Sequence, residues 1–318
     1  MLREPPRTLD EFRGLFSESE DPRQWPHVAT GVMYRRGVRA LAAFFGCEAT
    51  EDAVFSHRLS VPPLDYASAL LRATGTEALL IDDGFPPAEL SVNWEELGRV
   101  AGCPSAPVMR IERVTAEAGL SGVADAVSRA RVDGFVGLKT IAAYRGGLDL
   151  SLVHAEVRDG LVRALEANHA TGDPLPLQVH CGFGDADLSL PLARPGLLKP
   201  LIERFDTTPF VLLHCYPFVR EAGWLAHVYP NVFFDLSLTI PHVTQPATAL
   251  REALELAPVS KLLYASDAAR TPELYYLAAM WWRDALAEVL PELSGDDAEA
   301  DARAILRDNA AALYGLAP

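Results

Sequence analysis

The 318-residue sequence predicts an α/β fold, a TIM (β/α)8-type barrel preceded by a helical segment. From about residue 77 onward, short apolar strings alternate with longer amphipathic stretches, which is typical of a parallel sheet covered by helices on both faces. Polar residues that end three of these strings are spaced at roughly 30 to 40 residues, close to the length of one barrel unit. No G-x-G-x-x-G or G-x-x-x-x-G-K-[ST] motif favours the rival doubly wound sheet.

Seven apolar strings predict strands, one fewer than a closed barrel of this type needs. They cover residues 77–81, 106–111, 135–139, 175–180, 209–214, 232–236 and 261–264. Either one strand is hidden, or the sequence begins just after it. We expect a barrel that lacks its first strand.

Helical periodicity predicts the elements between and before these strands. The predicted helices cover residues 9–16, 31–45 and 64–74, and then 152–169, 197–205, 219–228, 247–256, 273–290 and 296–314. We expect residues 1–76 to form a helical segment packed on a barrel formed by residues 77–318, the two making one structural unit.

Composition restricts the partners and the location. The 28 Lys and Arg residues against 43 Asp and Glu residues give a net charge of −15, which argues against nucleic acid and anionic membrane surfaces as partners. The sequence has no apolar run long enough to span a membrane and no secretory core near residue 1, so we expect a cytoplasmic enzyme. The four cysteines lack metal-site spacing and are interpreted as packing residues.

Polar residues at the ends of the predicted strands are the candidate site. His180 and His214 end two strands, and Asp267 follows the last. A single histidine of this kind is usually a core residue, but two in matched positions with a carboxylate favour a divalent metal such as zinc, as one ion or two. The ligands must be unprotonated to bind it.

Three further basic residues lie near the same strand ends. Lys139 ends an apolar run, and three interpretations stay open: a salt-bridged structural lysine, a cationic substrate clamp, or a carbamylated metal-bridging lysine. Arg145, on a glycine-rich loop, and Arg110 are candidate substrate-binding residues.

Five segments carry a family resemblance. They are GLKTIAAYRGGL (137–148), LQVHCGFGDADL (177–188), VLLHCYPFVREAGWLAHVYPNVFFDLSL (211–238), KLLYASDA (261–268) and ILRDNAAALYGL (305–316). The chain resembles the amidohydrolase superfamily, in particular the amidohydrolase-related group similar to the amino-terminal region of nodulin and glutamine-synthetase-like fusion proteins. The resemblance implies a barrel with a metal centre, usually zinc, that activates water to hydrolyse a C–N or related bond.

The resemblance also implies roles for individual residues. His180 corresponds to the ligand on the family's fifth strand, and His214 to the sixth-strand ligand or an acid beside it. Asp267 corresponds to the eighth-strand carboxylate that takes the water's proton, and Lys139 to the position of the carbamylated lysine. The family's first strand ends in His-x-His, which occurs nowhere in this sequence. We expect that the sequence starts at an internal methionine, with natural loss of the motif as the second choice.

These observations predict a metal-dependent hydrolase of a small polar or anionic substrate, with Asp267 and His214 as catalytic residues. Two alternatives stay open: a catalytically silent barrel that binds a ligand or a partner, and a metal-dependent decarboxylase. The expected partner is a small-molecule substrate, with self-association into a homo-oligomer as a further expectation.

Overall fold

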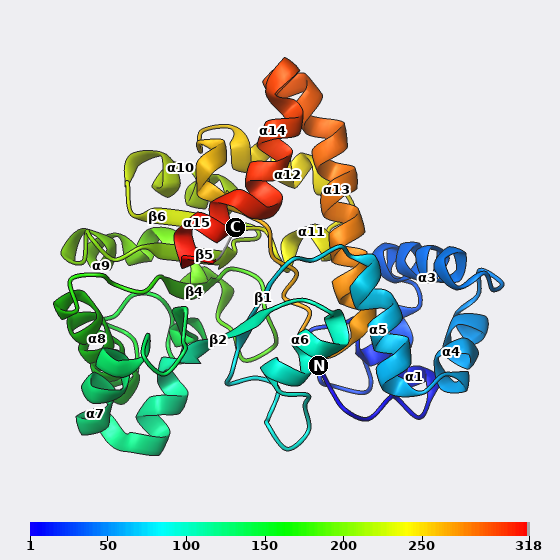
Figure 1. The fold of residues 1–318 in the computed structure, drawn as a ribbon, viewed down its shortest axis with the longest axis horizontal. Coiled ribbons are helices and arrows are strands. Elements are labelled where there is room, and N and C mark those ends of the chain that lie inside the picture. Colours follow the sequence, from blue (N-terminus) through cyan, green and yellow to red (C-terminus); the bar gives the residue numbers. More distant parts are fainter. Residues whose placement is uncertain (317–318) are drawn as a thin grey trace.

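The computed structural model describes residues 1–316, and at its centre lies a curved sheet of seven parallel strands (Figure 1). Each strand pairs with the next one along the chain, in the order β1 to β7. The strands are Leu79–Asp82 (β1), Ser105–Arg110 (β2), Gly137–Thr140 (β3), Leu177–Cys181 (β4), Phe210–His214 (β5), Val232–Asp235 (β6) and Leu262–Leu263 (β7). All seven strands predicted from the sequence are confirmed, and the fold is a TIM barrel that lacks one strand.

The first and last strands, β1 and β7, leave a seam in the described barrel, because no pairing joins them. Residues 1–3 cross this seam between the loop after β1 and the loop after β7. The Leu2 N–H donates to the Arg270 carbonyl at 3.0 Å, and the Arg3 N–H donates to the Leu90 carbonyl at 2.9 Å. These backbone bonds hold the two loops together at the carboxyl ends of the strands.

Helices surround the sheet and form a separate layer on one side (Figure 1). That layer consists of Leu9–Gly14 (α1), Trp25–Val28 (α2), Val32–Phe45 (α3), Glu51–Ser60 (α4) and Pro63–Ala73 (α5). The barrel helices are Trp94–Ala101 (α6), Ile111–Arg129 (α7), Ala155–Ala170 (α8), Lys199–Arg204 (α9), Val219–Val228 (α10), Thr239–His242 (α11), Pro246–Leu254 (α12), Pro272–Ser294 (α13), Ala298–Arg303 (α14) and Asn309–Tyr314 (α15).

The short helices α2 and α11 and three longer ones, α4, α6 and α7, were not predicted from the sequence. Side-chain caps mark the start of two of the longer ones: the Thr50 hydroxyl accepts the Ala53 N–H at 3.3 Å before α4, and the Asn93 side chain accepts the Glu96 N–H at 2.8 Å before α6. Such caps are a sequence signal for a helix start. Helix α7 is broken at Gly119, which has a φ of 66°, so its apolar period is interrupted.

One hydrophobic core joins the N-terminal helices to the barrel. Phe12, Phe16 and Tyr34 pack together and belong to the same buried cluster as Leu277 and Trp281 of α13. Close packing at this contact depends on Gly37, since a Cβ there would lie 3.0 Å from a methyl group of Leu277. The hydrophobic core is continuous across residue 76. The expected division of the chain at that residue stays a prediction.

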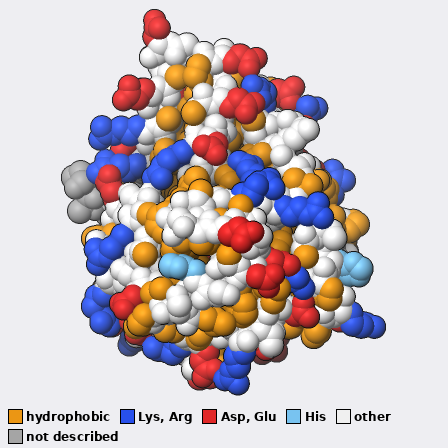
Figure 2. Space-filling view, turned by 90° about the vertical axis from the view of Figure 1, so that its right-hand side faces the viewer, with side chains coloured by type: hydrophobic (Ala, Val, Ile, Leu, Met, Phe, Trp, Pro, Cys, Tyr) orange, Lys and Arg blue, Asp and Glu red, His pale blue; other side chains and the backbone are white. Residues whose placement is uncertain are grey.

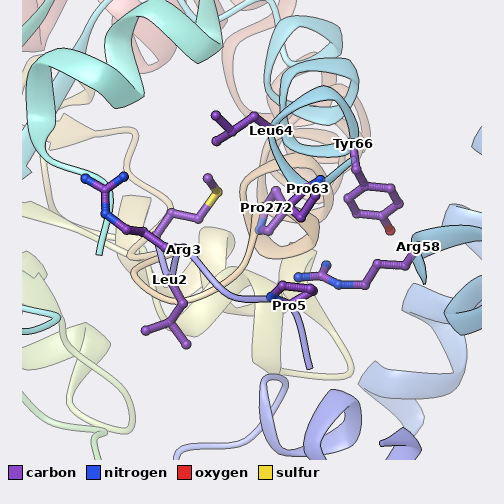
Figure 3. A pocket seen from close by; sticks show the side chains of 9 residues that line it. Leu2, Arg3, Pro5, Arg58, Pro63, Leu64, Tyr66 and Pro272 are labelled. Atoms are coloured by element: carbon purple, nitrogen blue, oxygen red, sulfur yellow. The ribbon is translucent and has the colours of Figure 1, made fainter. Parts of the chain in front are cut away.

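A buried ion pair ties α4 to the start of α13. The Arg58 guanidinium pairs with the Glu273 carboxylate, and the two residues are 8% and 0% exposed. Glu273 also accepts hydrogen bonds from the hydroxyls of Tyr66, at 3.0 Å, and Thr271. Figure 3 shows Arg58 and Tyr66 at one end of a small cavity, about 20 Å³ in volume, that Leu2 and Arg3 line at the other. The pair therefore lies at the junction of the two layers.

The surface of the N-terminal helical layer carries acidic and basic side chains that are interspersed with apolar ones (Figure 2). No single charge type dominates the face seen in this view. Among residues 1–316, none of the helices combines the length and the apolar character that crossing a membrane requires.

Replacing Glu273 by Ala should lower the free energy of unfolding by about 3 to 5 kcal/mol, because it leaves the Arg58 charge buried without its partner. Urea denaturation measures the change. As a control, Glu203→Ala removes one partner of the exposed Lys199 pair and should have little effect. Equal losses in the two variants would contradict the structural role of the buried pair.

Candidate functional site

The carboxyl ends of the central strands bring the predicted site residues together. His180 lies near the end of β4, His214 ends β5, and Asp267 lies in the loop after β7. The two imidazole ring centroids are 4.5 Å apart, and an Asp267 carboxylate oxygen lies 3.7 Å from His214 Nδ1. Lys139 of β3 is close enough to influence the pKa values of His180 and Asp267. The four residues form one cluster at the barrel mouth.

The backbone of this cluster is strained at the positions that aim its side chains. His214, Cys215 and Asp267 have φ values of 67°, 66° and 52°, which side-chain-bearing residues rarely adopt. Each such residue costs on the order of 1 to 3 kcal/mol, so the surrounding structure must hold it in place. Strain of this kind is concentrated at functional sites.

A hydrogen-bonded chain orients His214. One carboxylate oxygen of Asp235 accepts the His214 backbone N–H at 2.8 Å, the Ser237 backbone N–H at 3.0 Å and the Ser237 hydroxyl at 2.8 Å. Because this hydroxyl donates its hydrogen to Asp235, it can only accept from His214 Nδ1, which lies 2.7 Å away. His214 Nδ1 therefore carries the ring hydrogen, and Nε2 carries a lone pair.

Both imidazoles present a buried nitrogen that has no hydrogen-bond partner among the described residues, Nε2 in each case. Burial lowers the pKa of His180 and of His214 well below the ordinary value, so both rings are neutral. The Tyr144 ring lies 4.6 Å from the His180 ring. A Cβ on Gly184 would lie 2.1 Å from the Tyr144 hydroxyl and 3.0 Å from His180 Nε2, so glycine keeps the space before that nitrogen open.

A second network holds Lys139. Its ammonium group lies 3.0 Å from an Asp82 oxygen, and the Arg110 guanidinium pairs with the same carboxylate. Burial of Asp82 alone would raise its pKa, but Lys139 and Arg110 outweigh this effect and lower the pKa to about 2. Lys139 thus forms a salt bridge with Asp82, and the choice among its three interpretations stays a prediction.

Of the two arginines predicted to bind substrate, one is engaged by a carboxylate at the mouth and the other lies on the surface. Arg110 is engaged by Asp82, and its side chain is only 14% exposed. Arg145 is exposed, and its guanidinium donates to the Tyr144 carbonyl at 3.1 Å. Their proposed contact with substrate stays a prediction.

The side chains at the mouth are of the type that binds a divalent metal, but they include fewer ligands than a metal site needs. Neutral imidazole nitrogens are common zinc ligands, and a zinc site takes at least three protein ligands. Within residues 1–316, no group of three or more His, Cys, Asp or Glu side chains is arranged to hold an ion. Cys181 and Cys215 are buried in the core as free thiols, in agreement with their interpretation as packing residues.

Sequence reasoning missed several groups around the mouth. Ser237 and Tyr144 were not singled out, and Glu18 comes from the loop after α1, far from any predicted strand. Glu18 approaches His242 Nε2 at 4.0 Å and the Arg270 guanidinium at 3.8 Å. The polar strand-end pattern that identified His180 and His214 gives no signal for such distant residues.

Comparison with known proteins identifies similar chains. Residues 98–316 match the family model described as amidohydrolase. The protein fluG of Emericella nidulans is 30% identical over 87% of this chain, and the chain spans 39% of the length of that relative.

Solved structures share the fold. A protein from Lactobacillus casei, assigned as a metal-dependent hydrolase, is 30% identical with a TM-score of 0.86, over 99% of this chain and 92% of that one. Uronate isomerase from Thermotoga maritima is 15% identical with a TM-score of 0.61, over 96% and 82% of the two chains. An uncharacterised TIM-barrel protein from Bordetella bronchiseptica is 15% identical with a TM-score of 0.52, over 89% of each chain. The last two similarities concern the fold alone.

Replacing Glu18 by Gln should flatten the pH dependence of stability. Burial raises the pKa of Glu18 to about 7 from an ordinary value of 4.5, with Arg270 opposing and Asp267 adding to the rise. The folded protein therefore binds more protons than the unfolded chain between these values, and the free energy of unfolding falls as pH rises through this window.

Urea denaturation at several pH values between about 4.5 and 7 measures this slope. The exposed residue Glu48, which is not among the charges acting on Glu18, offers a control, and Glu48→Gln should keep the slope of the unmodified protein. An unchanged slope in Glu18→Gln would contradict the assignment.

Proposed function

The chain belongs to the amidohydrolase family, and from this premise we propose that it is a metal-dependent hydrolase that activates water to cleave a C–N or related bond of a small polar substrate. The observation that carries the proposal is the pair of buried, unpartnered Nε2 atoms on His180 and His214 with Asp267 beside them. Buried polar atoms without partners are rare in native proteins, and a bound ion or ligand is one explanation for two of them lying side by side.

We assign His180 and His214 to the binding of the metal. Both rings are neutral, which is the form that a metal requires, and the tautomer of His214 leaves a lone pair on its Nε2. A bound divalent ion would supply acidity to water, lowering its pKa toward about 7. The described residues provide two imidazoles in the cluster, and a metal site needs at least one more ligand. That a third ligand completes the site, and that the metal is zinc, are parts of the proposal.

Asp267 is the proposed general base. Burial raises the pKa of Asp267, and the nearby Lys139 and His180 offset only part of this rise. The carboxylate is therefore a stronger base than a free aspartate. Its side chain is 31% exposed, which leaves it open to water at the mouth. Asp82 holds the Lys139 ammonium at 3.0 Å, so Lys139 contributes a fixed positive charge beside the base.

The role proposed for His214 follows from its tautomer. Its ring hydrogen is on Nδ1, facing Ser237, and its Nε2 carries a lone pair. A ring in this state binds a metal or accepts a proton through Nε2, but it cannot donate a proton there. The arrangement supports the ligand role over the role of an acid toward the leaving group.

One observation favours the catalytically silent alternative, namely that the described residues form no three-ligand group. A measurement of metal content separates the two functions. The hydrolase requires an ion bound in stoichiometric amount at the imidazole pair, and the silent barrel does not.

We expect the protein to bind one or two divalent ions and to hydrolyse an activated ester such as p-nitrophenyl acetate. Asp267→Asn should lower kcat/KM about 10²- to 10⁴-fold, the usual contribution of a general base. The double variant His180→Ala, Asp267→Ala should lose its metal, which elemental analysis measures.

Asp187→Asn is the matched control, since Asp187 is an exposed carboxylate on the loop after β4. It should keep both metal and activity. Full metal occupancy in the double variant would refute the proposed site, and an unmodified protein that binds no metal would favour the silent barrel.

A further inference from the structure

The loop that follows α1 brings an acidic side chain to the barrel mouth. The Arg270 guanidinium donates to the Ser17 carbonyl at 2.8 Å and holds the loop there. One oxygen of the adjacent Glu18 lies 4.0 Å from His242 Nε2, and the other lies 3.8 Å from the Arg270 guanidinium. Glu18 precedes the part of the chain that matches the family model, so the match assigns it no role.

His242 presents a lone pair toward Glu18. Its Nδ1 lies 2.9 Å from the Leu238 carbonyl, which can only accept, so Nδ1 carries a hydrogen. Burial lowers the pKa of His242 to about 4, so the ring is neutral and Nε2 has no hydrogen. This Nε2 is buried and has no hydrogen-bond partner among the described residues.

Once Glu18 is ionised, above its pKa of about 7, two acceptors face each other across a 4.0 Å gap without a donor between them. The closest cation to the Glu18 carboxylate within residues 1–316, Arg270, is at 3.8 Å, beyond an ordinary hydrogen bond. An acceptor that is buried without a donor loses about 1 to 3 kcal/mol relative to water. A tetrahedral nitrogen that donates two hydrogens spans acceptors about 4.6 Å apart, from normal bond lengths, so a small opening of the 4.0 Å gap admits one.

The charge around this gap favours a positive donor over a neutral one. Asp267, Asp185 and Glu20 all add to the negative potential at Glu18, and Arg270 opposes them. A bound ammonium group would balance this excess and supply the hydrogens that Glu18 and His242 lack. The Phe183 ring, 5.6 Å from the His242 ring and 6.5 Å from the Tyr216 ring, offers an apolar wall for an attached carbon chain.

We propose that Glu18 and His242 form an ammonium-binding subsite at the barrel mouth, and that the substrate of the hydrolase is a small molecule that carries a primary amine. The substrate assignment rests on the proposed function, whereas amine binding itself does not. Glu18 is thereby a specificity-determining residue supplied by the N-terminal helical layer.

Saturation-transfer NMR with propylammonium, 1-propanol and propionate as probes tests the subsite on the full chain at pH 8. Alkylammonium groups stay protonated there, as lysine does. We expect binding of propylammonium and at least tenfold weaker binding of the other two probes. Glu18→Gln should weaken propylammonium binding about 10- to 100-fold, the value of a charged hydrogen bond, and His242→Phe should weaken it as well.

Glu48→Gln, which removes an exposed charge that is not among those acting on Glu18, should change the affinity less than twofold. Tighter binding of propionate would overturn the proposal and assign the subsite to an anion at Arg270. Equal affinity of Glu18→Gln and the unmodified protein would also overturn it. Because these measurements need no turnover, amine binding in a protein that lacks hydrolase activity would refute the proposed function and leave the subsite standing.

Discussion

A single carboxylate oxygen sets the arrangement of the barrel mouth. Asp235 Oδ1 accepts hydrogen bonds from two backbone N–H groups and the Ser237 hydroxyl, and these bonds fix His214 in a backbone conformation with a φ of 67°. Burial raises the pKa of Asp235 to about 6, and the three bonds limit that rise. Because the Ser237 hydroxyl is thereby committed, His214 Nδ1 carries the ring hydrogen and Nε2 remains an acceptor without a partner among the described residues. Without this carboxylate, neither the strained backbone nor the tautomer would have support.

The neighbouring charges are fixed in the same manner, by partners on adjacent strands. Arg110 and Lys139 are register partners on β2 and β3, and both reach the Asp82 carboxylate at the end of β1. Parallel strands that end at one rim thus hold two cations and one anion beside two neutral imidazoles. A mouth of this composition can bind a metal or a polar substrate while its own groups stay rigid, which is the condition for electrostatic catalysis.

The sequence was sufficient to predict the seven strands and the convergence of His180, His214 and Asp267, because apolar strings and the polar residues that end them follow the topology of a parallel barrel. It was not sufficient for Ser237 or Glu18, whose roles depend on side-chain directions and on the path of the N-terminal loop. The pairing of Arg110 with Asp82 was missed because strand register cannot be read from composition. The start of α6 could have been found from its cap, Asn93, whereas the break at Gly119 obscured α7.

The tautomer of His214 is the most direct test of this account, and long-range proton–nitrogen NMR correlation on the metal-free protein measures it. We predict a hydrogen on Nδ1 and none on Nε2 at neutral pH, with this preference weakened in Ser237→Ala. A hydrogen on Nε2 in the unmodified protein would contradict the account, because the ring could then neither bind a metal nor accept a proton at the mouth.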